Sequence, residues 1–534
     1  MKILIVNTFD INGGAARAAY RLHNALIKFG IQSTMLVQKK FSTDSTVIEI
    51  KDKNNNSFYN NLILNNYPNK TKTLFSSSII NNKDLIHYIN TSDADIVHLH
   101  WIVNNFLSTE DLLKIKKPII WTLHDMWPFT GGCHYTEECE KYKSSCDECI
   151  VLNSNQQGDL SSINYELKQK VYKKLSNLTI NAVSKWISNC AQESSLLKDK
   201  CIYNLPNPLD TNLFKPYTSE NIREELNLPL DKKIILFGAM NATSDPRKGY
   251  KYLEKALNKL EKDKYTFLVF GNTEESKEKN ITFLGNIYDD ITLSKIYSCV
   301  DVMIVSSIQE NLANTILESL SCGTPVVGFK IGGNSDMIDH KENGYLSKPF
   351  DTQDLADGIE WILHHPNYDE LCKNARKKVL TNFSEEIVVP KYIKLYKKIL
   401  KEAKSSKNNF KESSDIKLSN LYIKTFNKYI KEEKVKKELY FSKNFNKFFE
   451  QINSIDGNIL LYGNGTIGRT IQKLIPEKII DYVDIKDINH HPSTLKNMKY
   501  DKILISVLGR EKEIEEYLLK ELKINKNKII TIEL

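Results

Sequence analysis

The sequence has 534 residues, of which 41% are hydrophobic, and this is enough for about three domains with packed cores. It contains no run of 18 or more apolar residues, so we expect no membrane-spanning helix. The first apolar run, Ile3–Val6, is too short for the apolar part of a secretory signal, which predicts a cytoplasmic protein. The net charge of +8 includes a Lys-rich stretch at 386–450, which suits either an anionic membrane surface or ordinary solvated helix faces. Because the sequence has neither an arginine-rich arm nor a nucleic-acid-binding motif, no nucleic-acid partner is expected.

Short apolar runs alternate with amphipathic stretches in residues 1–210. The apolar runs are bounded by polar turns, as buried parallel strands are, and Ala15–Phe29 has apolar residues at helical spacing. We predict strands at Ile3–Val6, Ser33–Val37, Ile96–Leu99, Ile119–Leu123 and Leu178–Val183. This alternation predicts an α/β domain with a doubly wound parallel sheet.

Three prolines in Leu205–Pro216 mark a break, which we interpret as a hinge. The alternation then starts afresh and predicts a second Rossmann-like domain at 211–385. Its strands are predicted at Ile234–Phe237, Thr266–Phe270, Thr282–Leu284, Val302–Val305 and Pro325–Gly328. Two such domains place a cleft between the carboxyl ends of their sheets, where ligands bind in this architecture.

The last part of the chain is predicted to hold three further segments. Residues 386–402 have the apolar spacing of an amphipathic helix, which we expect to pack back on the N-terminal domain. Residues 403–455 are polar and rich in Lys, Asn and Ser, as a helical linker is. Residues 456–534 predict a third, small Rossmann-like α/β domain.

The strongest functional pattern runs from Glu310 to Glu318, between a predicted strand and the helix that follows it. Backbone N–H groups at the start of a helix attract anions, so this loop suits a diphosphate. Together with the Gly-Thr-Pro-Val-Val strand and Gly332-Gly333 that follow, the stretch resembles the E-x7-E motif of the family-4 (group 1) retaining glycosyltransferases of the GT-B fold. Two surface glutamates on a helix are the simpler alternative.

The resemblance implies a role for each part of this motif. Glu310 would face the hydroxyls of the donor sugar and Glu318 those of the ribose, since a carboxylate accepts from two neighbouring hydroxyls. The diphosphate would lie against the backbone of Leu312, Ala313, Asn314 and Thr315. Many relatives have Glu-Pro-Phe-Gly where this chain has Glu-Asn-Leu-Ala, which leaves the side-chain contacts of Asn311 and Leu312 open.

Two basic residues, Arg247 and Lys248, precede Gly249 at the start of a predicted helix. In the family a lysine before glycine, with an arginine nearby, clamps the donor diphosphate. Two cations there stabilise the charge that builds on the leaving phosphate, so no catalytic metal is expected. The family's arginine usually follows the strand directly, where this chain has Gly238-Ala239, and Arg247 is its candidate replacement.

Two further candidates follow predicted strands of the first domain. Gly13 and Gly14 resemble the family's glycine loop, in which the backbone approaches the donor phosphates closely, although a simple turn also explains them. His124 matches the histidine that relatives place over the donor sugar near its anomeric carbon. His98 and His100 are expected to pack in the core or to support His124 without contacting the sugar.

Four cysteines cluster directly after the strand that ends at His124. They are Cys133, Cys139, Cys146 and Cys149, in the spacing C-x5-C-x6-C-x2-C. In a reducing cytosol such a cluster favours a metal over disulfides, so we expect a structural zinc ion that staples a loop beside the site. Four free thiols are the alternative.

The third domain begins with a strand followed by G-x-G-x-x-G, in which the glycines are Gly463, Gly465 and Gly468. Asp484 ends the next predicted strand, at the position where an acidic residue meets a ribose in dinucleotide-binding folds. Binding of a nucleotide by this domain and a purely structural or partner-binding role both stay open.

These patterns together predict an enzyme of the hexosyltransferase type. It would move a sugar from a UDP- or GDP-sugar, held on the second domain, to a glycan or lipid-linked acceptor held on the first. The resemblance implies retention of configuration and a role in cell-surface polysaccharide biosynthesis, and the positive charge excess suits peripheral contact with the inner face of the membrane. A nucleotide-sugar epimerase on the same fold and an inactive sugar-nucleotide-binding scaffold are the alternatives.

Overall fold

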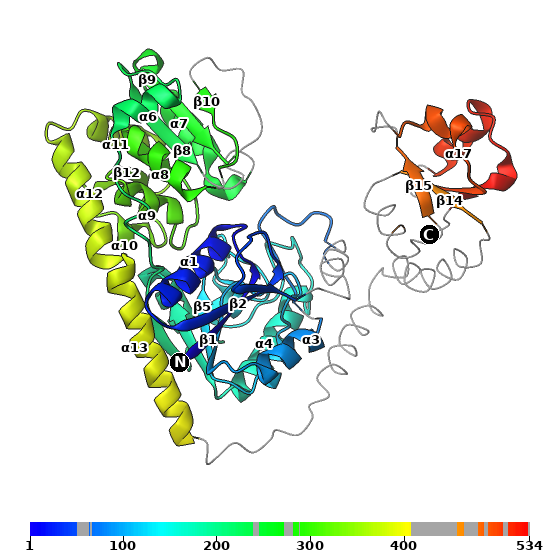
Figure 1. Ribbon diagram of the computed structural model, residues 1–534, viewed down its shortest axis with the longest axis horizontal. Coiled ribbons are helices and arrows are strands. Elements are labelled where there is room, and N and C mark those ends of the chain that lie inside the picture. The colour runs from blue at the N-terminus through cyan, green and yellow to red at the C-terminus, as the bar shows by residue number, and fades with distance from the viewer. Residues whose placement is uncertain are drawn as a thin grey trace. The chain divides into compact units, whose positions relative to one another are not determined.

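The computed structural model contains two compact units, residues 1–419 and 420–534, each described here by itself (Figure 1). The structure describes residues 1–50, 64, 67–78, 80–238, 245–271, 281–287, 289–406, 457–463, 472, 479–484, 490–505 and 511–531.

The first unit begins with a seven-stranded parallel sheet in the order β3-β2-β1-β4-β5-β6-β7. Its strands are β1 (Lys2–Phe9), β2 (Gln32–Lys39), β3 (Val47–Glu49), β4 (Ile96–Leu99), β5 (Ile119–Leu123), β6 (Leu178–Ala182) and β7 (Cys201–Asn204). The described helices of this domain are α1 (Gly14–Lys28), α3 (Lys83–Thr91), α4 (Leu160–Lys174) and α5 (Lys185–Glu193), with 3-10 turns at Glu110–Lys114, Trp127–Phe129 and Lys141–Lys143. The central strands read as continuous apolar runs because helices cover both faces of the sheet.

A second parallel sheet follows, with six strands in the order β10-β9-β8-β11-β12-β13. Its strands are β8 (Lys233–Gly238), β9 (Tyr265–Phe270), β10 (Ile281–Phe283), β11 (Val302–Val305), β12 (Val326–Phe329) and β13 (Gly344–Ser347). The described helices are α6 (Ser219–Glu225), α7 (Tyr250–Leu257), α8 (Asp290–Cys299), α9 (Asn314–Ser321), α10 (Asn334–Met337), α11 (Thr352–Leu363) and α12 (Tyr368–Asn382), with 3-10 turns at Pro246–Lys248 and Lys262–Lys264.

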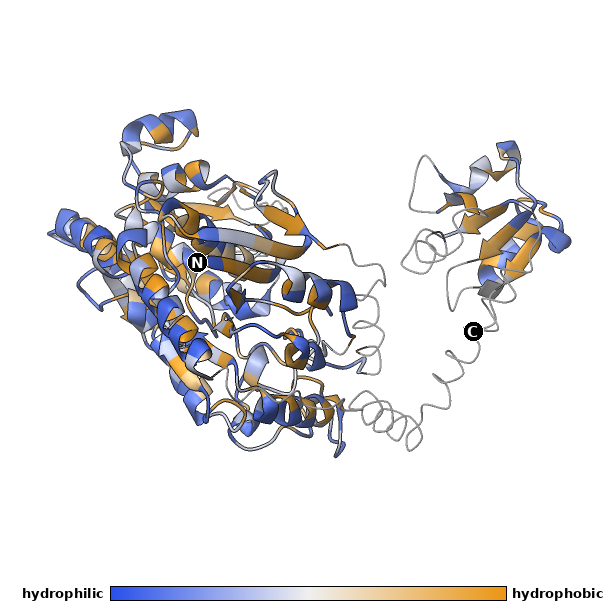
Figure 2. Ribbon diagram, turned by 60° about the horizontal axis from the view of Figure 1, so that its bottom comes forward, coloured by the Kyte–Doolittle hydropathy of each residue, from blue (hydrophilic) through white to orange (hydrophobic). Residues whose placement is uncertain are grey.

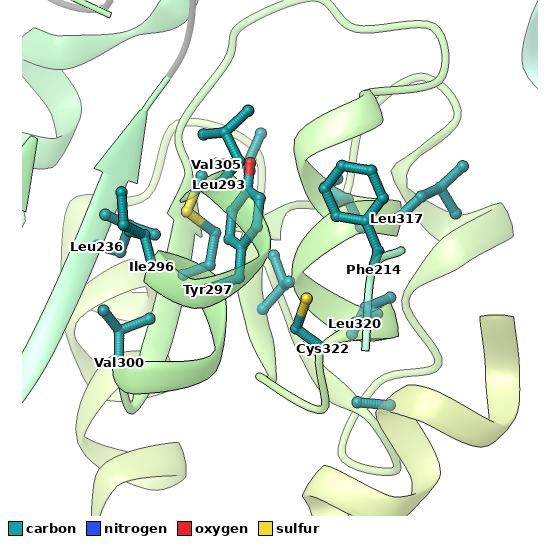
Figure 3. Packing of buried hydrophobic residues seen from close by; sticks show 14 of the residues in the cluster. Phe214, Leu236, Leu293, Ile296, Tyr297, Val300, Val305, Leu317, Leu320 and Cys322 are labelled. Carbon is teal, nitrogen blue, oxygen red and sulfur yellow. The ribbon is translucent and has the colours of Figure 1, made fainter. Parts of the chain in front are cut away.

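Successive residues of the second sheet face opposite cores. Ile234 and Leu236 pack with α8 and α9, whereas Ile235 and Phe237 pack with α7 and α11. Figure 2 shows the same arrangement by hydropathy, with apolar strands inside and polar helix faces outside. Figure 3 shows the α8–α9 side of this core, where Tyr297 and Leu320 pack between the sheet and the two helices.

A long helix, α13 (Glu385–Ser406), returns from the second domain to the first. Its Tyr392 and Tyr396 are buried in the same apolar cluster as Ile3 and Ile5 of β1. The chain therefore crosses between the domains twice, and the two crossings are joined where Leu209 N donates to the carbonyl of Phe383 at 2.9 Å. In the part of the chain that the structure describes, no helix combines the length and apolar character needed to cross a bilayer.

The second unit contains a four-stranded parallel sheet in the order β15-β14-β16-β17. Its strands are β14 (Ile459–Tyr462), β15 (Ile479–Val483), β16 (Lys502–Ile505) and β17 (Ile529–Thr531), and its described helical segments are α17 (Glu511–Lys520) and the 3-10 turns Pro492–Asn497 and Lys526–Lys528. The predicted fold class is thus confirmed, since all three α/β parts are built on parallel sheets.

Candidate functional site

The candidate residues lie on loops at the carboxyl ends of parallel strands in both sheets of the first unit. His124 directly follows β5, and Glu310 lies on the loop after β11. The starts of α1 and α9 also meet here, since the Asn314 side chain donates from Nδ2 to the carbonyl of Gly14 at 3.0 Å. The edge at which doubly wound domains bind ligands is therefore shared by the two domains.

An ion pair joins two of the predicted residues, Lys248 and Glu310. Their Nζ and Oε2 atoms are 2.8 Å apart, and the side chains are 18% and 9% exposed. Burial alone would raise the pKa of Glu310, but the charges of Lys248 and Arg247 hold it below the usual value. The carboxylate is therefore ionised at neutral pH and can accept hydrogen bonds from sugar hydroxyls.

Backbone contacts fix the position of Lys248 against the Glu310 loop. The carbonyl of Lys248 accepts from the Ser306 hydroxyl at 3.0 Å. Gly249 has a φ of 69°, and a Cβ at this position would stand 1.9 Å from the Ser306 carbonyl oxygen. The Lys-Gly pair is thus a geometric requirement of this close approach, because only glycine fits there.

Arg247 lies between the two domains. It forms an ion pair with Asp245 at 2.9 Å, and its guanidinium stands 4.8 Å from the ring centre of Tyr135, a residue of the first domain. A cation over an aromatic face is an attractive arrangement, and here it orients the guanidinium beside the Lys248–Glu310 pair. Two cations thus stand close to one buried carboxylate.

Glu318 is buried and already has two partners. Arg21 of α1 approaches its Oε1 at 2.7 Å, and the Tyr297 hydroxyl donates to its Oε2 at 2.9 Å. Figure 3 shows the Tyr297 ring within the core, with its hydroxyl at the edge of the apolar cluster. Arg21 therefore links α1, the helix after the glycine loop of the first domain, to α9 of the second. A ribose bound at Glu318 would have to share the carboxylate with Arg21.

The start of α9 offers backbone donors. Its N-terminal flanking residue is Ala313, which provides no side-chain acceptor for the first amides of the helix. Leu312 and Ala313 are largely buried, whereas Asn314 and Thr315 are partly exposed. Across from them Gly13 has a φ of 107°, a conformation that favours glycine.

His124 belongs to a row of three adjacent histidines, in which its ring stacks on that of His100. Its Nε2 lies 2.8 Å from Nδ1 of His100, whose ring is 4.4 Å from that of His98. Burial lowers the pKa of His124 to about 4, so the ring is neutral near pH 7. One ring nitrogen of the His100–His124 pair therefore donates and the other accepts, and this hydrogen bond fixes the orientation of the His124 ring.

The four clustered cysteines line one cavity of about 20 Å³, which has room for a single small ion or water. Gly131 N donates to Sγ of Cys146 at 3.2 Å, and the amides of Val151 and Leu152 donate to Cys149. As the side chains stand, however, no three His, Cys, Asp or Glu residues of the described ranges form a group that could hold a metal. Zinc binding, which would need the four thiols to come within reach of one ion, stays a prediction.

Metal analysis of the purified protein tests this prediction. We expect about one zinc ion per chain, since structural zinc is bound by four protein ligands. A Cys133→Ser/Cys146→Ser variant should lose the metal, whereas Cys299→Ser, which alters a buried thiol of the second domain, should keep it. Zinc at background level in the wild-type protein would show that the four thiols are free.

Comparison with known families identifies the first unit. Residues 12–212 match the model described as Glycosyltransferase Family 4, and residues 218–379 match the model described as Glycosyl transferases group 1. Together the two matches cover more than half of the chain. The chain is a group 1 glycosyltransferase of the GT-B fold.

Relatives of this glycosyltransferase come from several organisms. An uncharacterised glycosyltransferase of Methanocaldococcus jannaschii is 24% identical over 323 residues, which are 57% of this chain and 75% of the relative. The N,N'-diacetylbacillosaminyl-diphospho-undecaprenol alpha-1,3-N-acetylgalactosaminyltransferase of Campylobacter jejuni is 28% identical over 201 residues, 35% of this chain and 52% of that enzyme. Among solved structures, HepE of Anabaena in complex with UDP-glucose gives a TM-score of 0.52 at 15% identity, covering 76% of this chain and all of that one.

Three residues of the glycosyltransferase that contact predicted site residues were not predicted from the sequence, and they are Arg21, Tyr135 and Tyr297. Arg21 lies one helical turn after Arg17, so the pair of arginines beside the glycine loop was a usable signal. Tyr297 lies in the buried face of α8, and nothing in its local pattern distinguishes it from a core residue.

The C-terminal unit of the glycosyltransferase lies outside both family matches. Gly463 follows β14 with a φ of 105°, and its amide donates to the carbonyl of Val483 at 2.7 Å. Asp484 thus follows the neighbouring strand, at the position that the motif predicts. Gly465 and Gly468 lie outside the described residues, and nucleotide binding by this unit stays a prediction.

Proposed function

We propose that this glycosyltransferase transfers a sugar, with retention of configuration, from a UDP-sugar to a glycan or lipid-linked acceptor. The observation that carries the proposal is the Lys248–Glu310 ion pair, set beside Arg247 and the uncapped start of α9. HepE, which shares the fold, binds UDP-glucose, which favours UDP over GDP. The Campylobacter relative is named for a diphospho-undecaprenol acceptor, which favours cell-surface glycan synthesis at the inner face of the membrane.

The residues supply the chemistry that such a transfer needs. Negative charge builds on the diphosphate as the glycosidic bond breaks, and Lys248, Arg247 and the first amides of α9 would stabilise it. These groups would make a catalytic metal unnecessary. Glu310 would hold the hydroxyls of the sugar, and the neutral His124 ring would supply a hydrogen bond above it. Closure of the two domains would exclude water and so suppress hydrolysis of the donor.

A nucleotide-sugar screen tests the function. UDP-glucose, UDP-N-acetylglucosamine, UDP-N-acetylgalactosamine and GDP-mannose are compared by thermal shift, because a ligand that binds only the folded state raises the melting temperature. The donor found in this way is then incubated with undecaprenyl-diphosphate-linked sugars, with and without EDTA. We expect release of UDP that requires an acceptor and persists in EDTA, and a product whose anomeric configuration matches the donor.

Other outcomes would contradict the proposal in distinct ways. Interconversion of the donor without any acceptor would show an epimerase. Binding without turnover across the acceptor panel would favour an inactive scaffold. Loss of activity in EDTA that Mg²⁺ or Mn²⁺ restores but Zn²⁺ does not would refute metal-independent transfer.

A further inference from the structure

Asn311 connects the two domains beside the proposed transfer site. Its Nδ2 donates to the carbonyls of Leu123 and His124 at 3.1 and 3.0 Å. Its Oδ1 accepts from the Ser184 hydroxyl at 2.6 Å, and the residue is only 2% exposed. One side chain of the second domain thus bonds three groups of the first.

The hydrogen-bonding pattern specifies a carboxamide at this position. Two carbonyl oxygens need two N–H donors, and the Ser184 hydroxyl needs an acceptor, and asparagine is short enough to present both on one planar group. The reverse orientation of the amide would set its oxygen against two carbonyl oxygens. The network therefore fixes which end of the amide faces β5.

The backbone of Asn311 is held as firmly as its side chain. A Cβ on Gly333 would stand 1.8 Å from the Asn311 carbonyl oxygen, and the Gly333 amide donates to the Glu310 carbonyl at 3.2 Å. Asn311 therefore cannot shift without moving Glu310, its neighbour in the chain.

The partners on the first domain are equally well ordered. Leu123 ends the buried central strand β5, and His124 follows it directly. Ser184 caps α5, where its hydroxyl accepts from Ile187 N at 3.1 Å while donating to Asn311. The amide of Asn311 thus relates the Glu310 loop to a strand end and a helix start of the opposite domain.

We propose that Asn311 is a positioning residue, whose side-chain amide sets the spacing between His124 and Glu310 across the cleft. This inference rests on the proposed function and deepens it. Asn311 would act on the transfer step through these two residues, without touching the sugar, by stabilising the closed arrangement in which they face one donor. Binding of the nucleotide to the second domain alone would not depend on it.

The test compares Asn311→Ala with Asn343→Ala. Asn343 is a matched control, because it is 1% exposed and its side chain also makes two hydrogen bonds, to Met337 O at 3.0 Å and from Asp339 N at 2.8 Å, all within the second domain. We expect Asn311→Ala to lower kcat about 30-fold, from the loss of three hydrogen bonds, with the Kd for UDP changed less than about threefold. Asn343→Ala should keep kcat within about threefold of wild type.

Two further variants separate positioning from folding. Ser184→Ala removes one of the three bonds from the first domain, so its loss of kcat should be smaller and should not add to that of Asn311→Ala. Asn311→Asp places a carboxylate against two carbonyl oxygens and should be at least as impaired as the alanine variant. Equal kcat values for Asn311→Ala and Asn343→Ala would overturn the proposal.

Hydrogen–deuterium exchange of the full chain supplies a readout that needs no substrate. Asn311→Ala should speed amide exchange in peptides covering 119–126 and 184–190, whereas Asn343→Ala should not. If wild type transfers no sugar yet this difference appears, the proposed function fails and the contact between the domains stands. Unchanged exchange in both peptides would show that Asn311 does not hold the domains together.

Discussion

Replacing Lys248 by methionine should lower turnover about 100-fold or more, because the leaving diphosphate would lose a preorganised cation. The same change leaves the buried Glu310 carboxylate without its ion-pair partner. Removing one partner of a buried ion pair lowers the free energy of unfolding by about 3–5 kcal/mol. Activity and stability would therefore fall together, and the single variant cannot separate them.

The double variant Lys248→Met/Glu310→Gln separates the two effects. A neutral pair restores the balance of charge, so the melting temperature should return toward that of wild type while turnover stays low. Lys255→Met, on the exposed face of α7, is the matched control for removal of a lysine and should leave both quantities unchanged. Steady-state kinetics and thermal unfolding are measured on all four variants, Glu310→Gln included. Wild-type turnover in the double variant would exclude both residues from the transfer step.

The parts of the fold that were predictable are those with a strong local pattern. The run Val302–Val305, for example, is apolar without interruption because both faces of the sheet are covered, and this strand was predicted with its observed bounds. The short strands β3, β7 and β13 were not predicted. β7, for example, has no fully buried residue, so its sequence carries little of the apolar signal on which such predictions depend.

The residues of the candidate site likewise fall into those with a local sequence pattern and those without one. Glu310, Lys248 and His124 could be named from the sequence because each stands in a motif beside a predicted strand. Arg21 and Tyr135, which contact Glu318 and Arg247, were missed because they come from distant parts of the chain and reach these residues only through domain packing. Arg21, for instance, is 297 positions from Glu318 in the sequence, yet its Nη1 atom lies 2.7 Å from Oε1 of Glu318.

Asn311 shows what a departure from a motif can mean. In the sequence it appeared as a residue whose contacts could not be transferred from the family. In the structure it makes three hydrogen bonds to the opposite domain. A residue that differs from the family motif, yet is buried with its hydrogen bonds made, is best interpreted as an adaptation to the packing of the two domains.

Lowering the pH from 6.5 to 4 should destabilise the first domain through its buried histidines. Burial lowers the pKa of His98 to about 3 and that of His23 to about 4, and both side chains are fully buried. Ring nitrogens of His98 contact the hydroxyls of Tyr396 and Thr122 at 2.8 and 2.7 Å, so no carboxylate compensates a charge on this ring.

The sign of the effect follows from proton linkage. An unfolded histidine binds a proton near pH 6.5, whereas these folded rings stay neutral until the pH falls to their own lower pKa. Their stabilising contribution is therefore complete above pH 6.5 and is lost as the pH falls toward 4, by on the order of 3 kcal/mol for each ring. Carboxylates with lowered pKa, such as Glu310 and Asp125, would add to the loss only at lower pH.

Unfolding by urea between pH 7 and 4.5 measures this dependence. His98→Gln should reduce the pH slope of the unfolding free energy by up to about 1.4 kcal/mol per pH unit, the value for one proton. The exposed His87→Gln serves as control and should keep the wild-type slope. The pH slope of the unfolding free energy reports the number of protons taken up on unfolding and not the stability itself. A variant that is less stable at every pH therefore still tests the prediction. His23→Gln should behave like His98→Gln, and wild-type slopes in both would mean that these rings do not control acid stability. Since the His98 ring packs against that of His100, and His100 is hydrogen-bonded to His124, the same protonation would also disturb the position of His124 in the transfer site.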